Sequence, residues 1–227
     1  TGFLGFDMLD GEYKMMGLAP YGSPDYLPFI RQNILLTDAP GSYRLNGDLL
    51  DYHAALKKQF HPKLLEAFGS PRLSDDAPFT ERHRQIAASA QAAFEEVVGD
   101  MASWAFQQGG KRTNVAIAGG CGLNCSANGK LLRDGPFTRM YVPPAPHDAG
   151  CAVGAALLLH HERLGKPRQF EMTHAYYGPA HGEQDIGRAL CALGLEARPM
   201  ADEEALLQRA VQALCSGQIL AWFHGPM

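Results

Sequence analysis

The first segment whose residue types could do chemistry is the glycine-rich stretch at 118–129, AGGCGLNCSANG. It follows the apolar run at 114–117 and precedes a helical pattern, so a strand, a turn and a helix start are predicted in that order. Glycines let backbone N–H groups come close to a phosphate, and a helix N-terminus adds partial positive charge. The spacing matches neither the Walker A loop nor the dinucleotide fingerprint. The stretch therefore indicates a phosphate-binding turn of another kind.

The second segment is the Pro- and Gly-rich loop at 143–150, which contains Asp148. A carboxylate that follows a strand and precedes a helix can reach a bound metal or a phosphate-bound cation. Asp148 could instead cap the helix that is expected to begin near Cys151. His147 is either a second ligand or an exposed neighbour.

Two further pairs of polar residues could contact a ligand. Asn124 and Asn128 lie four residues apart near the glycine turn, where they could hydrogen-bond a ribose or a base, or could simply cap the helix. Glu12 and Lys14 form the charged pair of an otherwise apolar segment. Lys14 could contact a phosphate and Glu12 could position a group or accept a proton, and the alternative for both is a solvated turn of helix.

The elements that must position these residues follow one another in the order α-β-α-β-α after residue 80, which is typical of an α/β fold. The clearest is a helix over 80–108, with apolar residues at steps of three or four, Thr80 as its cap and Gly109-Gly110 as its end. The other predicted elements are a hairpin at 43–50 with Asn46-Gly47 as its turn, strands at 114–118, 139–142, 195–199 and 219–223, and helices at 12–19, 124–133, 151–163, 184–193 and 202–216.

Composition narrows the class of protein. The 227 residues are 46% hydrophobic and 19% charged, with a net charge of −4, so no basic surface for nucleic acid is expected. No apolar run approaches the roughly 20 residues of a membrane helix. The odd count of five cysteines fits no disulfide framework and favours reduced thiols in the cytoplasm. The first residues and the strand-like last run lead us to expect a piece of a longer protein.

Four motifs in order give the chain a resemblance to the O-carbamoyltransferases, which carbamoylate antibiotics and nodulation factors. EYKMMGLAPYG at 12–22 resembles their DEYKVMGLAPYG, and GGCGLNCSANG at 119–129 resembles their GGVALNCVANG. PPAPHDAGCAVGAA at 143–156 resembles their PAxGDxGxAxGAA, and ILAWFHG at 219–225 resembles IVAWFQG, which opens their second catalytic region. Cys121-Gly122 and His147 depart from the family's usual residues without removing a proposed ligand.

The resemblance implies an actin-like ATPase lobe with a ribonuclease-H-like fold, followed by a YrdC-like α/β domain. Residues 1–175 would be the C-terminal part of the Kae1-like nucleotide- and metal-binding domain, and 176–227 a linker and the start of the YrdC-like domain. In that family, carbamoyl phosphate is cleaved to carbamate, which reacts with ATP to give carbamoyl adenylate and pyrophosphate. A hydroxyl of a small acceptor, a sugar or natural product, then attacks the carbamoyl carbon.

The resemblance also implies roles for residues of this chain. Gly119, Gly120, Asn124 and Asn128 would lie against ATP, and Lys14 and Glu12 would serve the reaction. Asp148 would bind a divalent metal, with Fe²⁺ expected before Mg²⁺ or Mn²⁺, beside two histidines from an earlier segment.

Two other functions stay open at this point. One is an actin-like transferase that acts on tRNA or in hydrogenase maturation. The other is a non-catalytic nucleotide-binding or interaction module, a role that an incomplete lobe would itself play. Because such a lobe exposes an apolar face, we expect association in solution, with a homodimer as one form, and no carbamoyl transfer by the 227 residues alone.

Overall fold

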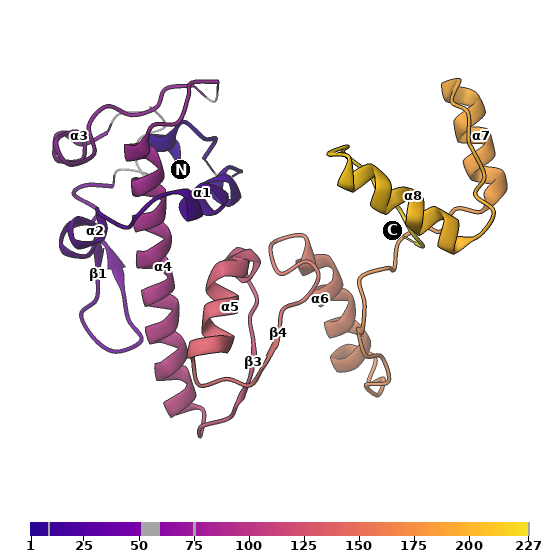
Figure 1. The fold of residues 1–227 in the computed structure, drawn as a ribbon. Coiled ribbons are helices and arrows are strands. Elements are labelled where there is room, and N and C mark those ends of the chain that lie inside the picture. The colour runs from indigo at the N-terminus through magenta and orange to yellow at the C-terminus, as the bar shows by residue number, and fades with distance from the viewer. Residues whose placement is uncertain (9, 51–59, 75, 227) are drawn as a thin grey trace. The chain divides into compact units, whose positions relative to one another are not determined.

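The computed structural model describes residues 1–8, 10–50, 60–74 and 76–226 (Figure 1). They divide into two compact units, Thr1–Arg163 and Leu164–Met227. This division falls ahead of the predicted boundary after residue 175, and the assignment of the two parts to Kae1-like and YrdC-like domains stays a prediction.

The first unit is organised around the long helix α4 (Glu81–Gln108). The side chain of Thr80 accepts a hydrogen bond from the backbone of His83, whose ring in turn accepts from the N–H of Thr80, so a capping box fixes the start of the helix. The helix ends at Gly109, whose N–H donates to Ala105 O over 2.7 Å. The predicted helix over 80–108 is confirmed.

One side of α4 is covered by the elements that precede it in the chain, and these form the main apolar core. Phe68 lies at the centre of an aromatic group, with edge-on contacts to Phe3, Tyr26 and Phe29 at centroid distances of 5.1–5.6 Å. The elements are η1 (Gly2–Leu4), α1 (Glu12–Leu18), η2 (Ala19–Tyr21), α2 (Leu27–Asn33), β1 (Leu35–Leu36), β2 (Arg44–Leu45) and α3 (Pro62–Phe68).

The predicted hairpin at 43–50 is wrong. Arg44–Leu45 pairs antiparallel with Leu35–Leu36, which precedes it in the chain. A turn does begin at Asn46, whose O accepts from the N–H of Leu49 over 3.2 Å, but no strand follows it in the described residues through 50. The N–H of Asn46 donates to Ile34 O and its side-chain amide to Asn33 O, both over 2.9 Å. These bonds tie the end of β2 back to the end of α2.

Beyond α4 the chain builds a small parallel sheet with its connecting helix. β3 (Asn114–Ala116) pairs in parallel with β4 (Arg139–Tyr141), and α5 (Cys125–Asp134) connects them. The short η3 (Gly120–Leu123) precedes α5, and α6 (Gly150–Leu158) follows β4 and continues into a π-helical turn, Leu159–Arg163. The predicted order α-β-α-β-α is confirmed, and the fold is mixed α/β.

The second unit holds two helices, α7 (Glu183–Leu193) and α8 (Glu203–Cys215). Asp202 caps α8 by accepting from the N–H of Ala205 over 2.8 Å. The strands predicted at 195–199 and 219–223 are wrong, because both runs lack strand structure and Ile219 is fully exposed. An apolar run forms a strand only where a neighbour pairs with it. Throughout the described part of the chain, helices fall short of the length and apolar character needed to cross a membrane.

A buried arginine ties the N-terminal segment to the loop ahead of α4. The guanidinium of Arg72 lies over the rings of Phe79 and Phe6, at 4.0 and 5.6 Å from their centroids. Its Nη1 donates to Leu4 O over 3.0 Å and its Nε donates to Ala77 O over 2.7 Å. Since Arg72 is only 5% exposed, these contacts are made out of water, where such charge-assisted bonds are strongest.

His83 stands beside this arginine in the first turn of α4. Its Nδ1 accepts from the N–H of Thr80 over 3.1 Å, which places the proton of the neutral ring on Nε2. The Nε2 atom is buried without a hydrogen-bond partner among the described residues. Burial lowers the pKa of His83, and the neighbouring positive charges of Arg82, Arg72 and Arg84 lower it further. The folded protein therefore favours the neutral ring.

We expect His83 to make stability fall on acidification. Because the folded pKa lies below the unfolded value near 6.5, the unfolded chain binds the extra proton, and stability is lost as the pH drops through that value toward the folded pKa. His83→Asn keeps an acceptor for the Thr80 N–H and removes the titrating ring. Urea unfolding between pH 7.5 and 5.5 should show wild type losing more stability than this variant, and parallel pH profiles would contradict the assignment.

Candidate functional site

The glycine turn and the loop of Asp148 lie together at the carboxyl ends of the two parallel strands. The N–H of Gly119 donates to Pro146 O over 2.7 Å, and the N–H of Ile117 donates to Tyr141 O over 2.9 Å. Gly122 is buried against the same loop, since a Cβ there would lie 3.3 Å from Pro146 Cβ. This edge is where open α/β sheets place their ligands.

The glycine turn has the backbone freedom that its sequence predicts. Gly119 has a φ of 92°, a conformation that residues with a side chain rarely adopt, and it turns the chain from β3 into η3. Gly119 and Gly120 are exposed, with open space where a Cβ would stand. A phosphate can therefore approach the backbone here, although the N–H of Gly119 itself is already donated to Pro146.

The two asparagines hold the turn in place. Asn124 caps α5, with its Oδ1 accepting from the N–H of Ala127 over 3.0 Å. Asn128 donates from Nδ2 to Gly122 O over 2.8 Å. The capping alternative is thus confirmed for Asn124, and contact of either residue with a nucleotide stays a prediction.

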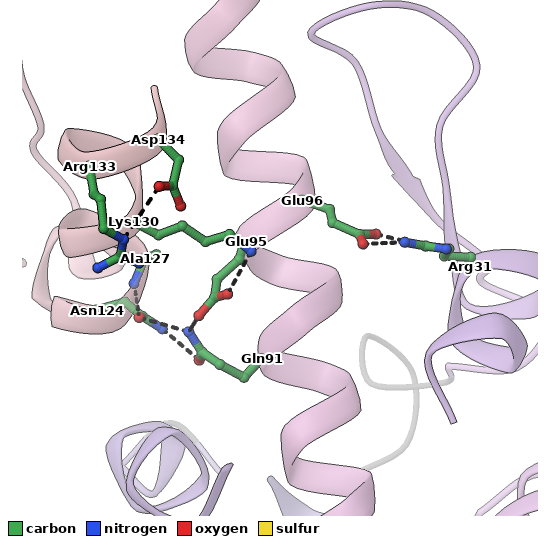
Figure 2. Close-up of polar contacts among 9 residues, drawn as sticks. All are labelled: Arg31, Gln91, Glu95, Glu96, Asn124, Ala127, Lys130, Arg133 and Asp134. Carbon is green, nitrogen blue, oxygen red and sulfur yellow. Dashed lines mark hydrogen bonds and ion pairs between the residues drawn. The ribbon is translucent and has the colours of Figure 1, made fainter. Parts of the chain in front are cut away.

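Asn124 also contacts α4, which the sequence did not reveal. Its amide exchanges two hydrogen bonds with the amide of Gln91, and Gln91 donates to Glu95 (Figure 2). The sequence held one signal for this contact, a polar residue on the alanine-rich face of α4. Gln91 follows Ala87 by one turn and is only 8% exposed. Its partner could not be read from spacing, because the two residues lie 33 positions apart.

Asp148 is exposed in the turn that precedes α6. The cap of α6 is Ala149, and no side chain caps the helix, so the alternative role of Asp148 as a helix cap is wrong. His147 is an exposed neighbour whose Nδ1 accepts from the N–H of Ala149 over 3.4 Å. Within the described ranges, no three His, Cys, Asp or Glu side chains gather as a metal site. These residues therefore offer a metal one exposed carboxylate and not a complete ligand set.

Lys14 and Glu12 lie on α1. Lys14 is half-buried, with its Nζ 5.9 Å from the centroid of the Phe6 ring, and Glu12 is exposed. Glu12 lines a groove that also reaches Cys121 and Asn128 at the turn.

That groove has a volume of about 990 Å³ and is predominantly apolar. It runs along α4, which contributes Phe94, Val98 and Met101 among others, and it is bordered by β3 and the residue after it through Val115 and Ile117. The groove therefore extends from the long helix to the strand that leads into the glycine turn.

A model of one protein family matches most of the chain. The model, described as the carbamoyltransferase N-terminus, matches residues 1–157. The chain belongs to this family. The resemblance that the four motifs indicate is thereby confirmed, while the individual roles of the motif residues stay predictions.

Curated relatives match along nearly the whole chain. An uncharacterized protein of Synechocystis, sll1178, is 38% identical over 100% of the chain and 37% of its own length. Nodulation protein NolO of Bradyrhizobium diazoefficiens is 35% identical over 98% of the chain and 38% of its own length. Nodulation protein NolNO of Sinorhizobium fredii is 36% identical over 98% of the chain and 31% of its own length. The chain thus spans less than two fifths of the length of these relatives.

We expect Gly150→Ala to destabilise the Asp148 loop. An added Cβ would overlap the carbonyl oxygen of Ala145, a backbone atom that cannot move without distorting the loop. Overpacking of this kind costs about 1–3 kcal/mol of unfolding free energy. Gly154→Ala in the same helix is the control, because its Cβ meets open space and alanine favours the helix by about 1 kcal/mol. Urea unfolding of both variants measures the difference, and equal stability would contradict the close packing at Gly150.

The groove predicts association in solution, because exposed apolar surface of this extent favours burial against another surface. Sedimentation velocity should show larger species as the concentration rises. Phe94→Glu on the wall of the groove should shift the distribution toward the monomer, with Leu73→Glu, an exposed apolar residue outside the groove, as the control. A wild-type protein that stays monomeric at all concentrations would contradict the prediction.

Proposed function

We propose that this chain forms part of the ATP-binding lobe of a carbamoyltransferase, an actin-like lobe with the start of a YrdC-like domain after it. The observation that carries the proposal is the hydrogen bond from Gly119 N–H to Pro146 O, which holds an exposed glycine turn beside the loop of Asp148. Membership of the carbamoyltransferase family supports the class of reaction.

The proposed reaction uses carbamoyl phosphate as the source of the carbamoyl group. Water first hydrolyses carbamoyl phosphate to carbamate and inorganic phosphate. A carbamate oxygen then attacks the α-phosphorus of ATP, pyrophosphate leaves, and carbamoyl adenylate results. The hydroxyl of a small acceptor then attacks the carbamoyl carbon, loses its proton, and displaces AMP. Adenylation turns a poor leaving oxygen into a good one, so the acceptor need not be a strong nucleophile.

The residues of this chain have separate roles in the proposal. Gly119 and Gly120 give the nucleotide phosphates a close approach to the backbone, with Asn124 and Asn128 beside them. Asp148 contributes a carboxylate to a divalent metal that would neutralise charge on the phosphates. Lys14 and Glu12 would act on the carbamoyl side, Lys14 through its positive charge and Glu12 as an acceptor of a proton.

A calorimetric titration tests the nucleotide site directly. We expect ATP to bind this chain more tightly with Mn²⁺ or Fe²⁺ than without, and Asp148→Ala to weaken the metal-dependent binding about tenfold or more. Asp134→Ala is the control. It also removes an exposed carboxylate, but from the C-terminal end of α5, whereas the glycine turn precedes the N-terminal end. Binding that is equal in wild type and Asp148→Ala would contradict the ligand role of Asp148, and its absence in wild type would contradict a nucleotide site in this chain.

A further inference from the structure

We propose that Gln91 and Glu95 of α4 are positioning residues for the glycine turn. Together they fix the orientation of the Asn124 side-chain amide. That orientation sets the direction of its remaining N–H, which we propose donates to a ligand oxygen. The inference rests on the proposed function, in which the turn binds a nucleotide, but its structural half can be tested separately.

The hydrogen bonds of Asn124 are nearly all in use (Figure 2). Its Oδ1 accepts from the N–H of Ala127 and from Gln91 Nε2, each over 3.0 Å. Its Nδ2 donates to Gln91 Oε1 over 2.9 Å. A side-chain amide has two acceptor positions and two N–H donors, so one N–H of Asn124 has no acceptor among the residues that the structure describes. That donor suits an acceptor oxygen such as those of a phosphate or a ribose.

The direction of both amides is imposed from Glu95. An ionised carboxylate only accepts hydrogen bonds, and Gln91 Nε2 donates to Glu95 Oε1 over 2.8 Å. Gln91 must therefore turn its NH₂ group toward Glu95. The second hydrogen of that NH₂ reaches Asn124 Oδ1, and Gln91 Oε1 is left to accept from Asn124 Nδ2. Lys130 Nζ forms an ion pair with Glu95 Oε2 over 3.3 Å, on the side of the carboxylate away from Gln91.

The backbone N–H of Ala127, at the other end of this series of hydrogen bonds, imposes the same direction on the two amides. The backbone N–H of Ala127 can only donate, so Asn124 must present Oδ1 and not Nδ2 toward it. Flipping either amide would set two donors or two acceptors against each other. Because Gln91 is only 8% exposed, water cannot readily repair such a mismatch. Two fixed ends thus determine one arrangement, and Asn124 joins it to the glycine turn because it ends η3 and caps α5.

Glu95→Gln is the decisive substitution, and Glu96→Gln is its matched control. The glutamine at 95 keeps the shape of the side chain but can donate as well as accept, so the direction of Gln91 is then imposed from the Ala127 end alone and is held less firmly. Glu96 is the next residue of the same helix, and it pairs with Arg31 on the other side of α4 (Figure 2). Both changes remove one negative charge, and only the first touches the amide pair.

The first measurement needs no ligand. In ¹H–¹⁵N spectra of the isotope-labelled chain, Glu95→Gln should shift the side-chain amide signals of Asn124 and speed their hydrogen exchange. Glu96→Gln should leave both unchanged. Asn124 signals that do not respond to Glu95→Gln, or that respond equally to Glu96→Gln, would overturn the positioning role.

The second measurement is the affinity for ATP with Mg²⁺, taken together with the melting temperature. Glu95→Gln should weaken ATP binding about tenfold, while Glu96→Gln leaves it within about twofold of wild type. A merely structural role would lower the melting temperature and leave the affinity of the folded protein unchanged, which would overturn the proposal. Failure of wild type to bind ATP would defeat the proposed function instead, and the spectra would still decide whether Glu95 orients Asn124.

Discussion

The first unit depends on the long helix α4, which packs against other elements on two of its sides. On one side an apolar core of residues such as Ile30, Phe68 and Ile86 holds the segment that precedes the helix. On the other side α5 is held through a polar contact, the amide pair of Gln91 and Asn124. A parallel sheet of two strands has little stability of its own, so β3 and β4 rely on this helix for their position.

The candidate site follows from the topology beyond α4. Because β3 and β4 run parallel, both leave the sheet at the same edge, and the glycine turn and the Asp148 loop must meet there. The bond from Gly119 N–H to Pro146 O joins the two segments, and the buried contact of Gly122 with Pro146 supports it. Two of the four motifs that mark the family, at 119–129 and 143–156, thus lie where the backbone can approach a ligand. The side chains of Asn124 and Asn128 hold the turn between them in place.

The local parts of this structure could be predicted, and the long-range parts could not. The period of α4, its Thr80 cap and the order of the elements after residue 80 depend on neighbours in sequence, and the structure confirms them. The strand predictions at 195–199 and 219–223 failed because a short run forms a strand only where another strand pairs with it, and neither run pairs with a described strand. The partners of Arg72 and Gln91 were missed for a related reason, since Leu4 lies 68 and Asn124 33 positions away.

The measurement that tests the account most directly is hydrogen–deuterium exchange of the backbone, followed by mass spectrometry with and without ATP and Mg²⁺. Bound nucleotide should slow exchange in peptides that cover 118–129 and 143–151, the two segments joined at the carboxyl ends of β3 and β4. Peptides of α7 and α8 should be unaffected. Protection confined to other segments, or an ATP-dependent change in neither segment, would contradict a nucleotide site at the glycine turn.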